Sequence, residues 1–530
     1  MLLYVLPVWL ARFLPFVDLP QHLAFVNILR NFNSPATDYA RTCTLQLFPQ
    51  HNVLHLLICY PLSFLVGIEG ANRVFLTGAI VLLPLAMLHL LRTLNVRREF
   101  VFFSFLFIYN LDLLWGFLST ALAIPLVLLL LSLELRWLGR NEESKSQKVR
   151  KSKGPFDFST FRLLDFLWLS LLFILIFLGH SLMFLFAAVL YIAVLSAAPG
   201  NRKRGLLALI PLVPVLVFLV IPWQTQAFGR SENGLLSMVL GGFQLSSLLA
   251  RPLHFIADSG FRADDVGPFI HKFLLVLAFT LIISHVARNR FGSLIRGRLL
   301  VPSLLVMLSF AGYLLFPDAV SQAWFLNQRF AVFCWLFLIP LTALLAERNP
   351  RIAQTASGPE STRSVAGARK GILLVATFIL LVDAGNTLYR CIGFDLETRP
   401  LARLVTQLPA DRKVIGLPYE LRTKPDLTGY EVFMHTGCYY QTFKRGYPGF
   451  SFASVRFSPI QYRDPSPFLE LGSEWSPWYA IFPEGWQFYD YYLVHGEPRM
   501  PTKEDLERMK LIAREGRWSV YQRPDTSPAR

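Results

Sequence analysis

The sequence predicts a mainly helical, polytopic membrane protein that ends in a smaller α+β domain. Of its 530 residues, 54% are hydrophobic and only 16% are charged, and the mean hydropathy is +0.44. Several apolar runs approach the roughly 20 residues that an α-helix needs to cross a bilayer. From about residue 395 the composition changes to aromatic and polar residues punctuated by Pro and Gly, which is typical of a soluble domain.

By length and hydropathy we expect about eleven transmembrane helices. They are predicted at roughly 1–16, 71–93, 100–117, 118–138, 163–179, 181–198, 205–222, 270–287, 299–316, 329–346 and 371–388. The first is short and carries Arg12. The predicted domains are therefore a helical membrane domain over 1–394 and a soluble α+β domain over 395–530.

The basic residues predict the orientation of these helices. A formal net charge of +16 would suggest a nucleic-acid partner in a soluble protein. Here Lys and Arg cluster in alternate connections, as in loops that stay in the cytoplasm: 92–98, 145–153, 202–204, 288–298 and 348–370. We therefore expect no nucleic-acid partner, a multi-pass location in the inner membrane, and an extracytoplasmic C-terminal domain.

The predicted outer loop, residues 17–70, contains two apolar segments that we interpret as interfacial helices. His51–Ile68 is apolar enough to cross a membrane, but it contains Pro61, and counting it as a crossing would invert the loop before it. Pro20–Phe32 separates apolar and polar residues at helical spacing. The loop is thus expected to hold two helices joined by a polar turn.

In the soluble domain, three short segments alternate in the manner of strands, and one segment has helical periodicity. We expect strands at 414–418, 491–494 and 518–522. Lys503–Glu515 (KEDLERMKLIARE) predicts an amphipathic helix.

The outer loop also carries the first candidate site residues. Asp18 and His22, and likewise His51 and His55, are one helical turn apart, and ionisable groups beside a bilayer must be solvated, paired or used. A metal would suit the second pair, but no Glu stands between its histidines in the H-E-x-x-H manner. Asp258, Asp264 and Asp265 are candidate oxygen ligands, so a divalent cation stays an open alternative and no other cofactor is indicated.

Four more polar residues fall near the outer ends of predicted helices. They are Asp112, His180, Arg329 and Asp383. Polar groups scattered for packing should not sort to one side, whereas a water-filled cavity at the outer leaflet would collect them. The alternative for any one of them is a helix cap or a side chain that reaches the interface.

These features together resemble the GT-C superfamily, the multi-spanning glycosyltransferases that use polyprenyl-phosphate-linked sugars. The resemblance rests on the outer-loop carboxylate in FVDLPQHLAF, the two interfacial helices, the segment YNLDLLWGFLSTALAIPL and the soluble domain after the last crossing. DLPQHLA is similar to a D-x-P-x-H-L-A pattern of poorly characterised bacterial members. The paired acidic dipeptide of some members is absent, since Leu19 follows Asp18.

The resemblance implies an enzyme that moves a hexose or pentose, with inversion, from a polyprenyl-phosphate carrier to an extracytoplasmic glycan, lipid or protein. Asp18 would be the general base, and His22 would orient it or touch phosphate. Arg329, and secondly His180, would stabilise the departing phosphate. Asp112 and His55 complete the predicted substrate-binding residues.

Two other function classes remain open. A lipid or glycan transporter or flippase should have broken helices near the bilayer midplane and pseudo-symmetric halves. A non-catalytic membrane-anchored binding protein should leave Asp18 among lipid headgroups, with no cavity nearby.

Overall fold

The structure is a computed structural model of the full chain. It describes residues 1–148, 160–197, 209–213, 250–319 (except 253, 257, 259, 261–265, 290 and 295), 324–347, 361–455, 458–463, 474, 477, 488–499 and 502–524. The predicted helix at 205–222 lies mostly outside the described residues, as do Asp264 and Asp265.

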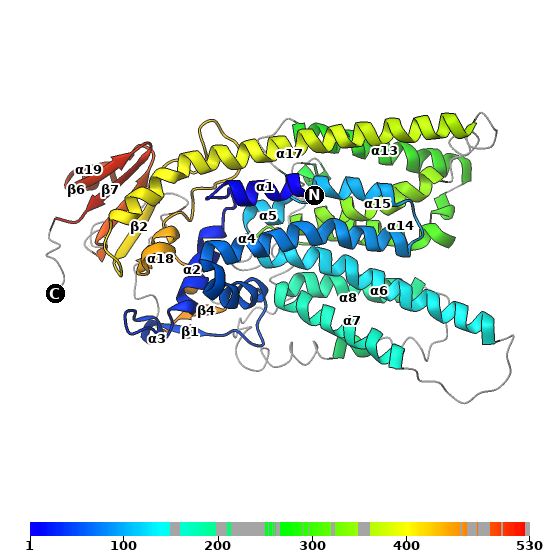
Figure 1. The fold of residues 1–530 in the computed structure, drawn as a ribbon, viewed down its shortest axis with the longest axis horizontal. Coiled ribbons are helices and arrows are strands. Elements are labelled where there is room, and N and C mark those ends of the chain that lie inside the picture. The colour runs from blue at the N-terminus through cyan, green and yellow to red at the C-terminus, as the bar shows by residue number, and fades with distance from the viewer. Residues whose placement is uncertain are drawn as a thin grey trace.

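The helices form an elongated bundle, and α17 runs along its length to the β-sheet at the other end of the molecule (Figure 1). The α-helices of the bundle and of the outer loop are α1 (Leu2–Leu10), α2 (Leu19–Arg30), α3 (Tyr39–Thr42), α4 (Leu54–Thr93), α5 (Leu111–Trp115), α6 (Leu118–Lys148), α7 (Thr160–Gly179), α8 (Ser181–Ala197), α13 (Val266–Asn289), α14 (Leu300–Leu315), α15 (Ala331–Glu347) and α17 (Ser361–Gln407). The 3₁₀ helices are η1 (Arg98–Phe107), η2 (Ile210–Leu212), η4 (Phe291–Ser293), η5 (Gly297–Leu299) and η6 (Gln328–Phe330).

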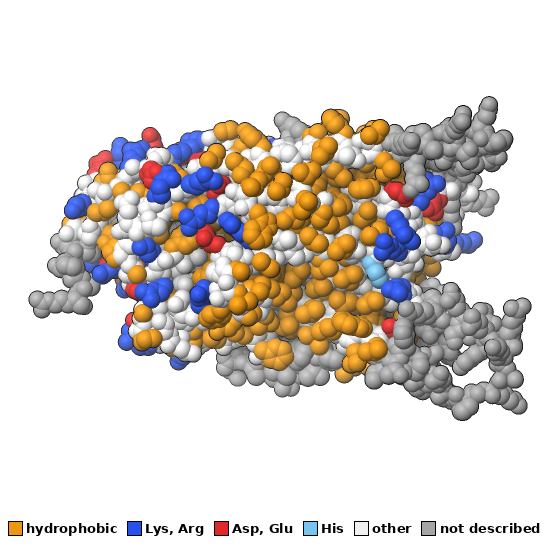
Figure 2. All heavy atoms as spheres, viewed as in Figure 1, with side chains coloured by type: hydrophobic (Ala, Val, Ile, Leu, Met, Phe, Trp, Pro, Cys, Tyr) orange, Lys and Arg blue, Asp and Glu red, His pale blue; other side chains and the backbone are white. Residues whose placement is uncertain are grey.

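Within the described residues, six helical segments are long and apolar enough to cross a membrane. They lie in α4, α6, α13, α14, α15 and α17, and α7 and α8 contribute two shorter apolar helices. Apolar side chains dominate a broad band over these helices, while Lys and Arg gather toward both ends of the molecule (Figure 2). The prediction of a mainly helical, multi-pass membrane protein is confirmed.

The predicted α-helix at 100–117 was wrong. This stretch is the 3₁₀ helix η1 followed by the short α5, whose cap Asn110 accepts a hydrogen bond from Leu113 N at 3.2 Å. Gly116, at φ 95°, ends α5. Because a 3₁₀ helix rises about 2 Å per residue, η1 alone covers about 20 Å and leads from Arg97 back toward the outer loop.

The first and last predicted helices differ in length from those observed. Instead of extending to residue 16, α1 ends at Leu10, and α17 continues to Gln407 instead of ending at 388. The buried Asp395 on α17 accepts hydrogen bonds from the backbone N–H groups of Arg12 and Phe13, at 3.0 and 2.9 Å. Since residue 395 lies inside α17, the chain passes from the bundle to the sheet without a break in the helix.

Besides the short α3, the outer loop contains the two predicted helices, α2 and the part of α4 that precedes Gly67. At φ 75°, Gly67 has a conformation that only glycine adopts freely, so the helix axis changes there. The segment before the bend exposes a run of apolar side chains, in which Phe64 is 55%, Leu65 81% and Val66 52% exposed.

The C-terminal part is built on a five-stranded sheet of order β3-β2-β5-β7-β6. Its strands are β2 (Lys413–Pro418), β3 (Tyr447–Pro448), β5 (Tyr491–His495), β6 (Lys510–Glu515) and β7 (Trp518–Gln522). The strand β2 is parallel to β3 and β5, whereas β7 is antiparallel to β5 and β6. Three of these strands, β2, β5 and β7, were predicted and are confirmed.

The predicted helix at 503–515 was wrong in its second half. Helix α19 (Thr502–Glu507) is short, and the following residues form β6, which pairs with β7. A bulge between Leu511 and Ala513 interrupts the alternation of side chains, which hides the strand from a periodicity test.

The outer loop and the C-terminal part are interlocked. Strand β1 (Cys43–Leu45) pairs antiparallel with β4 (Ile460–Tyr462), and α18 (Cys438–Lys444) packs on α2. Asn27 donates to Gln441 O at 2.7 Å across this contact. The 3₁₀ turn η7 (Phe452–Ser454) lies between α18 and β4 in the chain.

Candidate active site

Asp18 occupies the N-cap position of α2, where Pro20 in the first turn favours the start of a helix. Its carboxylate caps no backbone N–H. The segment before the helix is instead held by its backbone, because Val17 N and Asp18 N donate to Leu114 O and Trp115 O at 3.2 and 2.8 Å. The Asp18 side chain is therefore fixed, only 5% exposed, and left available for other contacts.

Gly116 makes this close approach possible. A Cβ at position 116 would lie 2.7 Å from Asp18 N and 3.0 Å from Asp18 Cβ. Neither atom belongs to a flexible side-chain end, so the added methyl group forces the two segments apart.

Replacing Gly116 by Ala is expected to destabilise the protein by about 2–4 kcal/mol, since both the contact and the positive φ oppose a side chain. Gly78→Ala is the matched control, because a Cβ at this position in α4 meets nothing within 4 Å. Thermal unfolding in detergent measures both variants. Equal melting temperatures for the two would contradict the packing argument.

His435, which the sequence analysis did not find, lies beside Asp18. Its Nε2 is 3.4 Å from Asp18 Oδ1, and its Nδ1 contacts Glu474 Oε2. The turn that carries it is held against the sheet by Gly437, which packs on Gly416 so closely that a Cβ on either would meet the other's backbone at 3.0–3.1 Å.

The two carboxylates determine the charge of His435. Burial alone would lower its pKa, but Glu474 and Asp18 together raise the pKa to about 10. The imidazole is thus a cation at neutral pH that donates to a carboxylate on each side. Phe450 and Phe452 border its ring, with centroids at 5.7 and 5.3 Å, and limit access of water.

Gln21 is a second residue that the sequence analysis missed. It is fully buried, and its Nε2 lies 3.3 Å from His435 Nδ1. Its Oε1 accepts a hydrogen bond from Phe452 N at 3.0 Å. Gln21 therefore ties the first turn of α2 to the segment that borders His435.

His22 and His55 lie next to this cluster. Their ring centroids are 5.3 Å apart. Burial lowers the pKa of His22, although the nearby Asp18 carboxylate opposes this shift, so His22 is neutral at pH 7. His55 Nε2 lies 3.1 Å from Asn72 Oδ1.

The spacing predicted that His51 and His55 share one face of a helix, and this prediction was wrong. His51 precedes α4, which begins at Leu54, and it lies instead close enough to His180 to interact with it electrostatically. Burial lowers the pKa of His51 to about 4. The chain between His51 and Leu54 is not helical, which is why sequence spacing misplaced the pair.

Arg329 is buried at the start of the α15 region. Its Nη1 donates to Thr120 Oγ1 at 3.1 Å and lies 2.6 Å from His180 Nε2. Its guanidinium carbon is 4.0 Å from the ring centroid of Phe117. Asp112 and, more weakly, Asp18 interact electrostatically with this guanidinium.

Hydrogen-bond donors exceed acceptors around His180. Leu182 N donates to His180 Nδ1 at 3.1 Å, while Arg329 Nη1 faces Nε2. A neutral imidazole accepts through only one nitrogen, so one of these N–H groups lacks an acceptor. Arg329 Nε also has no partner among the described residues, and an anion is the ligand that such spare donors favour.

The predicted residues thus form two groups joined by electrostatic contact. Asp18, His22 and His55 lie on the side of His435, and Asp112, His180 and Arg329 lie on the other. Asp112 Oδ1 and His55 Nδ1 are buried without a partner in the described part of the chain. Asp383 stands apart, since it accepts a hydrogen bond from Tyr4 at 2.7 Å.

A metal ion has no evident ligand set here. Among the described residues, no three His, Cys, Asp or Glu side chains are grouped so as to hold one. Asp258 accepts a hydrogen bond from Tyr313 at 3.0 Å. The divalent cation stays a prediction, because two of its three proposed oxygen donors lie outside the described residues.

No family model matches the sequence, and no curated protein matches it. The fold is similar to two crystal structures of ArnT from Cupriavidus metallidurans, one in the apo state and one bound to undecaprenyl phosphate. In both comparisons the sequence identity is 13%, the TM-score is 0.50 and 98% of this chain is covered. The match covers 95% of the apo and 96% of the ligand-bound ArnT chain. The chain therefore has the same overall fold as ArnT over nearly its whole length.

Proposed function

We propose that this protein is an inner-membrane glycosyltransferase that moves a sugar from a polyprenyl-phosphate carrier to an extracytoplasmic acceptor. The observation that carries the proposal is a buried carboxylate, Asp18, within electrostatic range of a buried guanidinium, Arg329, that has spare N–H donors. The shared fold supports it, because ArnT has been crystallised with undecaprenyl phosphate.

The reaction is a displacement at the anomeric carbon. The acceptor hydroxyl oxygen forms a bond to that carbon while Asp18 takes the hydroxyl proton. The bond between the anomeric carbon and the phosphate oxygen breaks, and its electron pair leaves with the polyprenyl phosphate. A direct displacement of this kind inverts the configuration of the sugar.

Arg329 stabilises the charge that grows on the departing phosphate. A guanidinium presents a planar fork of donors that matches phosphate oxygens, and its effect is largest where bulk water is excluded. The partners Thr120 and His180 hold the fork in place.

His435 acts as a positioning residue. As a cation 3.4 Å from Asp18, it orients the carboxylate, while Glu474 fixes the imidazolium from its other side. The C-terminal domain thereby supplies part of the active site.

The direct test uses vesicles that contain the full chain, radiolabelled polyprenyl-phosphate sugars and a cell-envelope extract as the acceptor source. We expect label to move into the acceptor fraction together with release of polyprenyl phosphate. Label that crosses the bilayer on an intact carrier would favour a flippase instead. Binding without either event would favour a non-catalytic protein.

The pKa of His435 predicts the alkaline pH dependence. Transfer is expected to fall as pH rises toward 10, because deprotonation removes the cation beside Asp18. His435→Gln should lower transfer by about 10–100-fold and lose this alkaline limb. His89→Gln, at the far end of α4, serves as the control.

The same group links stability to pH. Because the folded pKa of His435 lies above its unfolded value near 6.5, the stability it contributes is complete below that pH and is lost as pH rises through about 10. Melting temperatures from pH 7 to 10 should therefore fall more steeply for the native chain than for His435→Gln. If transfer and melting temperature fall with rising pH in His435→Gln as they do in the native chain, His435 has neither the positioning role nor the role in stability.

A further inference from the structure

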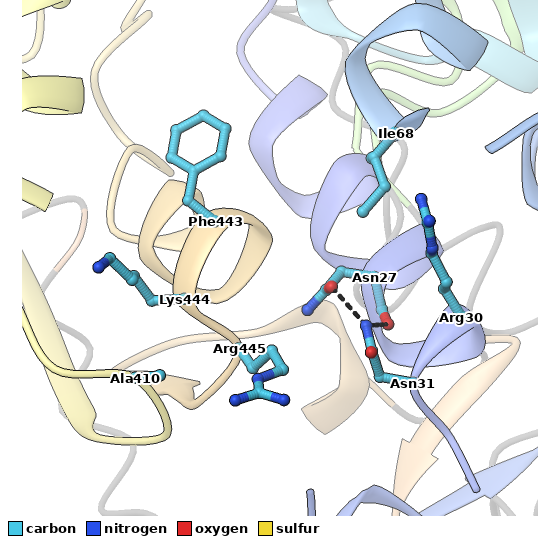
Figure 3. Close-up of a pocket in the computed structure, with 8 residues that line it drawn as sticks. All are labelled: Asn27, Arg30, Asn31, Ile68, Ala410, Phe443, Lys444 and Arg445. Carbon is cyan, nitrogen blue, oxygen red and sulfur yellow. Dashed lines mark hydrogen bonds between the residues drawn. The ribbon is translucent and has the colours of Figure 1, made fainter. Parts of the chain in front are cut away.

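A cavity separate from the Asp18 cluster opens between the outer loop and the C-terminal domain (Figure 3). Its volume is about 390 Å³. Helices α2 and α18 face each other across it, and the bend of α4 and the link before β2 complete the wall. The lining residues are Asn27, Arg30, Asn31, Ile68, Ala410, Phe443, Lys444 and Arg445.

The cavity wall is cationic. Three of the lining side chains are basic and none is acidic. Arg30 donates to Ser63 O at 2.8 Å and Lys444 to Thr406 O at 2.8 Å, so the hydrogen-bond partners found for both in the described chain are neutral carbonyls. Among the described residues, Arg445 alone of the three is offset by a carboxylate, Asp411, at 2.8 Å.

The polar wall of α2 is fixed in place. Asn27 is 3% exposed and donates to Gln441 O, and Asn31 donates to Asn27 Oδ1 at 2.8 Å. The asparagine side of the cavity is therefore held in place by hydrogen bonds within the protein.

The cavity also borders the exposed apolar surface of the outer loop. The Arg30 guanidinium carbon is 5.3 Å from the ring centroid of Phe64, in the run that exposes Leu65 and Val66. Ile68, just past the bend, lines the cavity itself. A cationic cavity beside an apolar helix face is complementary to a molecule with an anionic head and an apolar tail.

The distance to the active site suits a substrate. Asn27 lies nine residues after Asp18 on the same helix. At 1.5 Å per residue this is about 13 Å along the helix axis, a separation that one elongated amphiphile spans.

We propose that this cavity binds the oxyanion group, phosphate or carboxylate, of an amphiphilic acceptor whose apolar part lies on Phe64, Leu65 and Val66. The ligand's role as acceptor rests on the proposed glycosyltransferase function. The binding of the ligand to Arg30 and Lys444 is independent of that function, so binding and transfer are tested separately.

The experiment measures binding to the full chain in phosphatidylcholine nanodiscs, without any sugar donor. The probes are inorganic phosphate, dihexanoyl phosphatidic acid and, as the zwitterionic control, dihexanoyl phosphatidylcholine. We expect phosphatidic acid to bind more tightly than phosphatidylcholine, and Arg30→Gln and Lys444→Gln each to weaken it by about tenfold. The double variant Lys503→Gln/Arg508→Gln removes two exposed charges from the α19 region and should bind normally.

Each result decides the proposal. Binding of both phosphate and phosphatidic acid, weakened in Arg30→Gln and Lys444→Gln, supports an oxyanion site that needs no tail. Binding of phosphatidic acid alone supports an amphiphile. No binding, or binding that is equal in the native chain and in both variants, overturns the proposal. Asp18→Asn should bind the probes normally, so loss of transfer in that variant with intact binding separates the two proposals.

Discussion

Replacing Asp18 by Asn is expected to lower sugar transfer by about 10²–10⁴-fold, the range that a general base contributes. The amide has nearly the same shape as the carboxylate but accepts no proton at neutral pH. Since the backbone N–H of Asp18 and not its side chain holds the segment against Trp115 O, the variant should fold normally. Transfer from radiolabelled polyprenyl-phosphate sugars measures the effect.

Asp38→Asn is the matched control for this variant. Asp38 lies in the same outer loop, but its side chain is 59% exposed and pairs with Arg41. A large loss of transfer in the Asp18 variant, with little change in the Asp38 variant, supports Asp18 as the general base. Equal labelling by native chain and Asp18→Asn would remove Asp18 from its proposed role.

The helical bundle was predictable to a large extent because membrane helices are long apolar runs. The observed α7, α8, α14 and α15 lie within a few residues of their predictions. The 3₁₀ conformation of η1 could not be predicted, since apolar content does not distinguish a 3₁₀ helix from an α-helix. Likewise, α17 extends past its apolar part because Asp395 anchors its polar continuation to the residues after α1.

The candidate site was predictable only where its residues share a local pattern. Asp18 and His22 lie in one short motif at the start of a helix, and α2 confirms that helix. His435 and Glu474 follow Asp18 by more than 400 positions, and no spacing rule connects them. One feature of the sequence could have indicated His435: it is a histidine two residues before Gly437, in an aromatic-rich stretch of a domain that touches the outer loop.

The resulting site draws its charges from three distant parts of the chain. Asp18 comes from the outer loop, Arg329 from the start of the α15 region and His435 from the C-terminal domain. Two cations thus interact with one carboxylate, and the proposed mechanism assigns proton transfer and phosphate departure to different groups of this site. Opposite roles for neighbouring ionisable groups are typical of active sites.

Replacing Arg329 by Lys is expected to lower transfer by about 10²–10³-fold, although the positive charge is kept. A lysine ammonium is a point charge with no planar fork, so it cannot contact Thr120, face His180 and present a further donor to phosphate from one fixed plane. Arg298→Lys is the control, because Arg298 is exposed and donates to the backbone carbonyls of Leu94 and Asn95, far from the proposed site in the chain.

The kinetic parameters distinguish how Arg329 acts. If it stabilises the charge that develops as phosphate departs, kcat falls while KM for the polyprenyl-phosphate sugar changes little. If it only holds the carrier phosphate before reaction, KM rises and kcat is kept. Our mechanism requires the first result, since the spare donors beside His180 favour an anion with more charge than the bound phosphodiester carries. Unchanged kcat in Arg329→Lys would therefore contradict the mechanism, even with weaker binding.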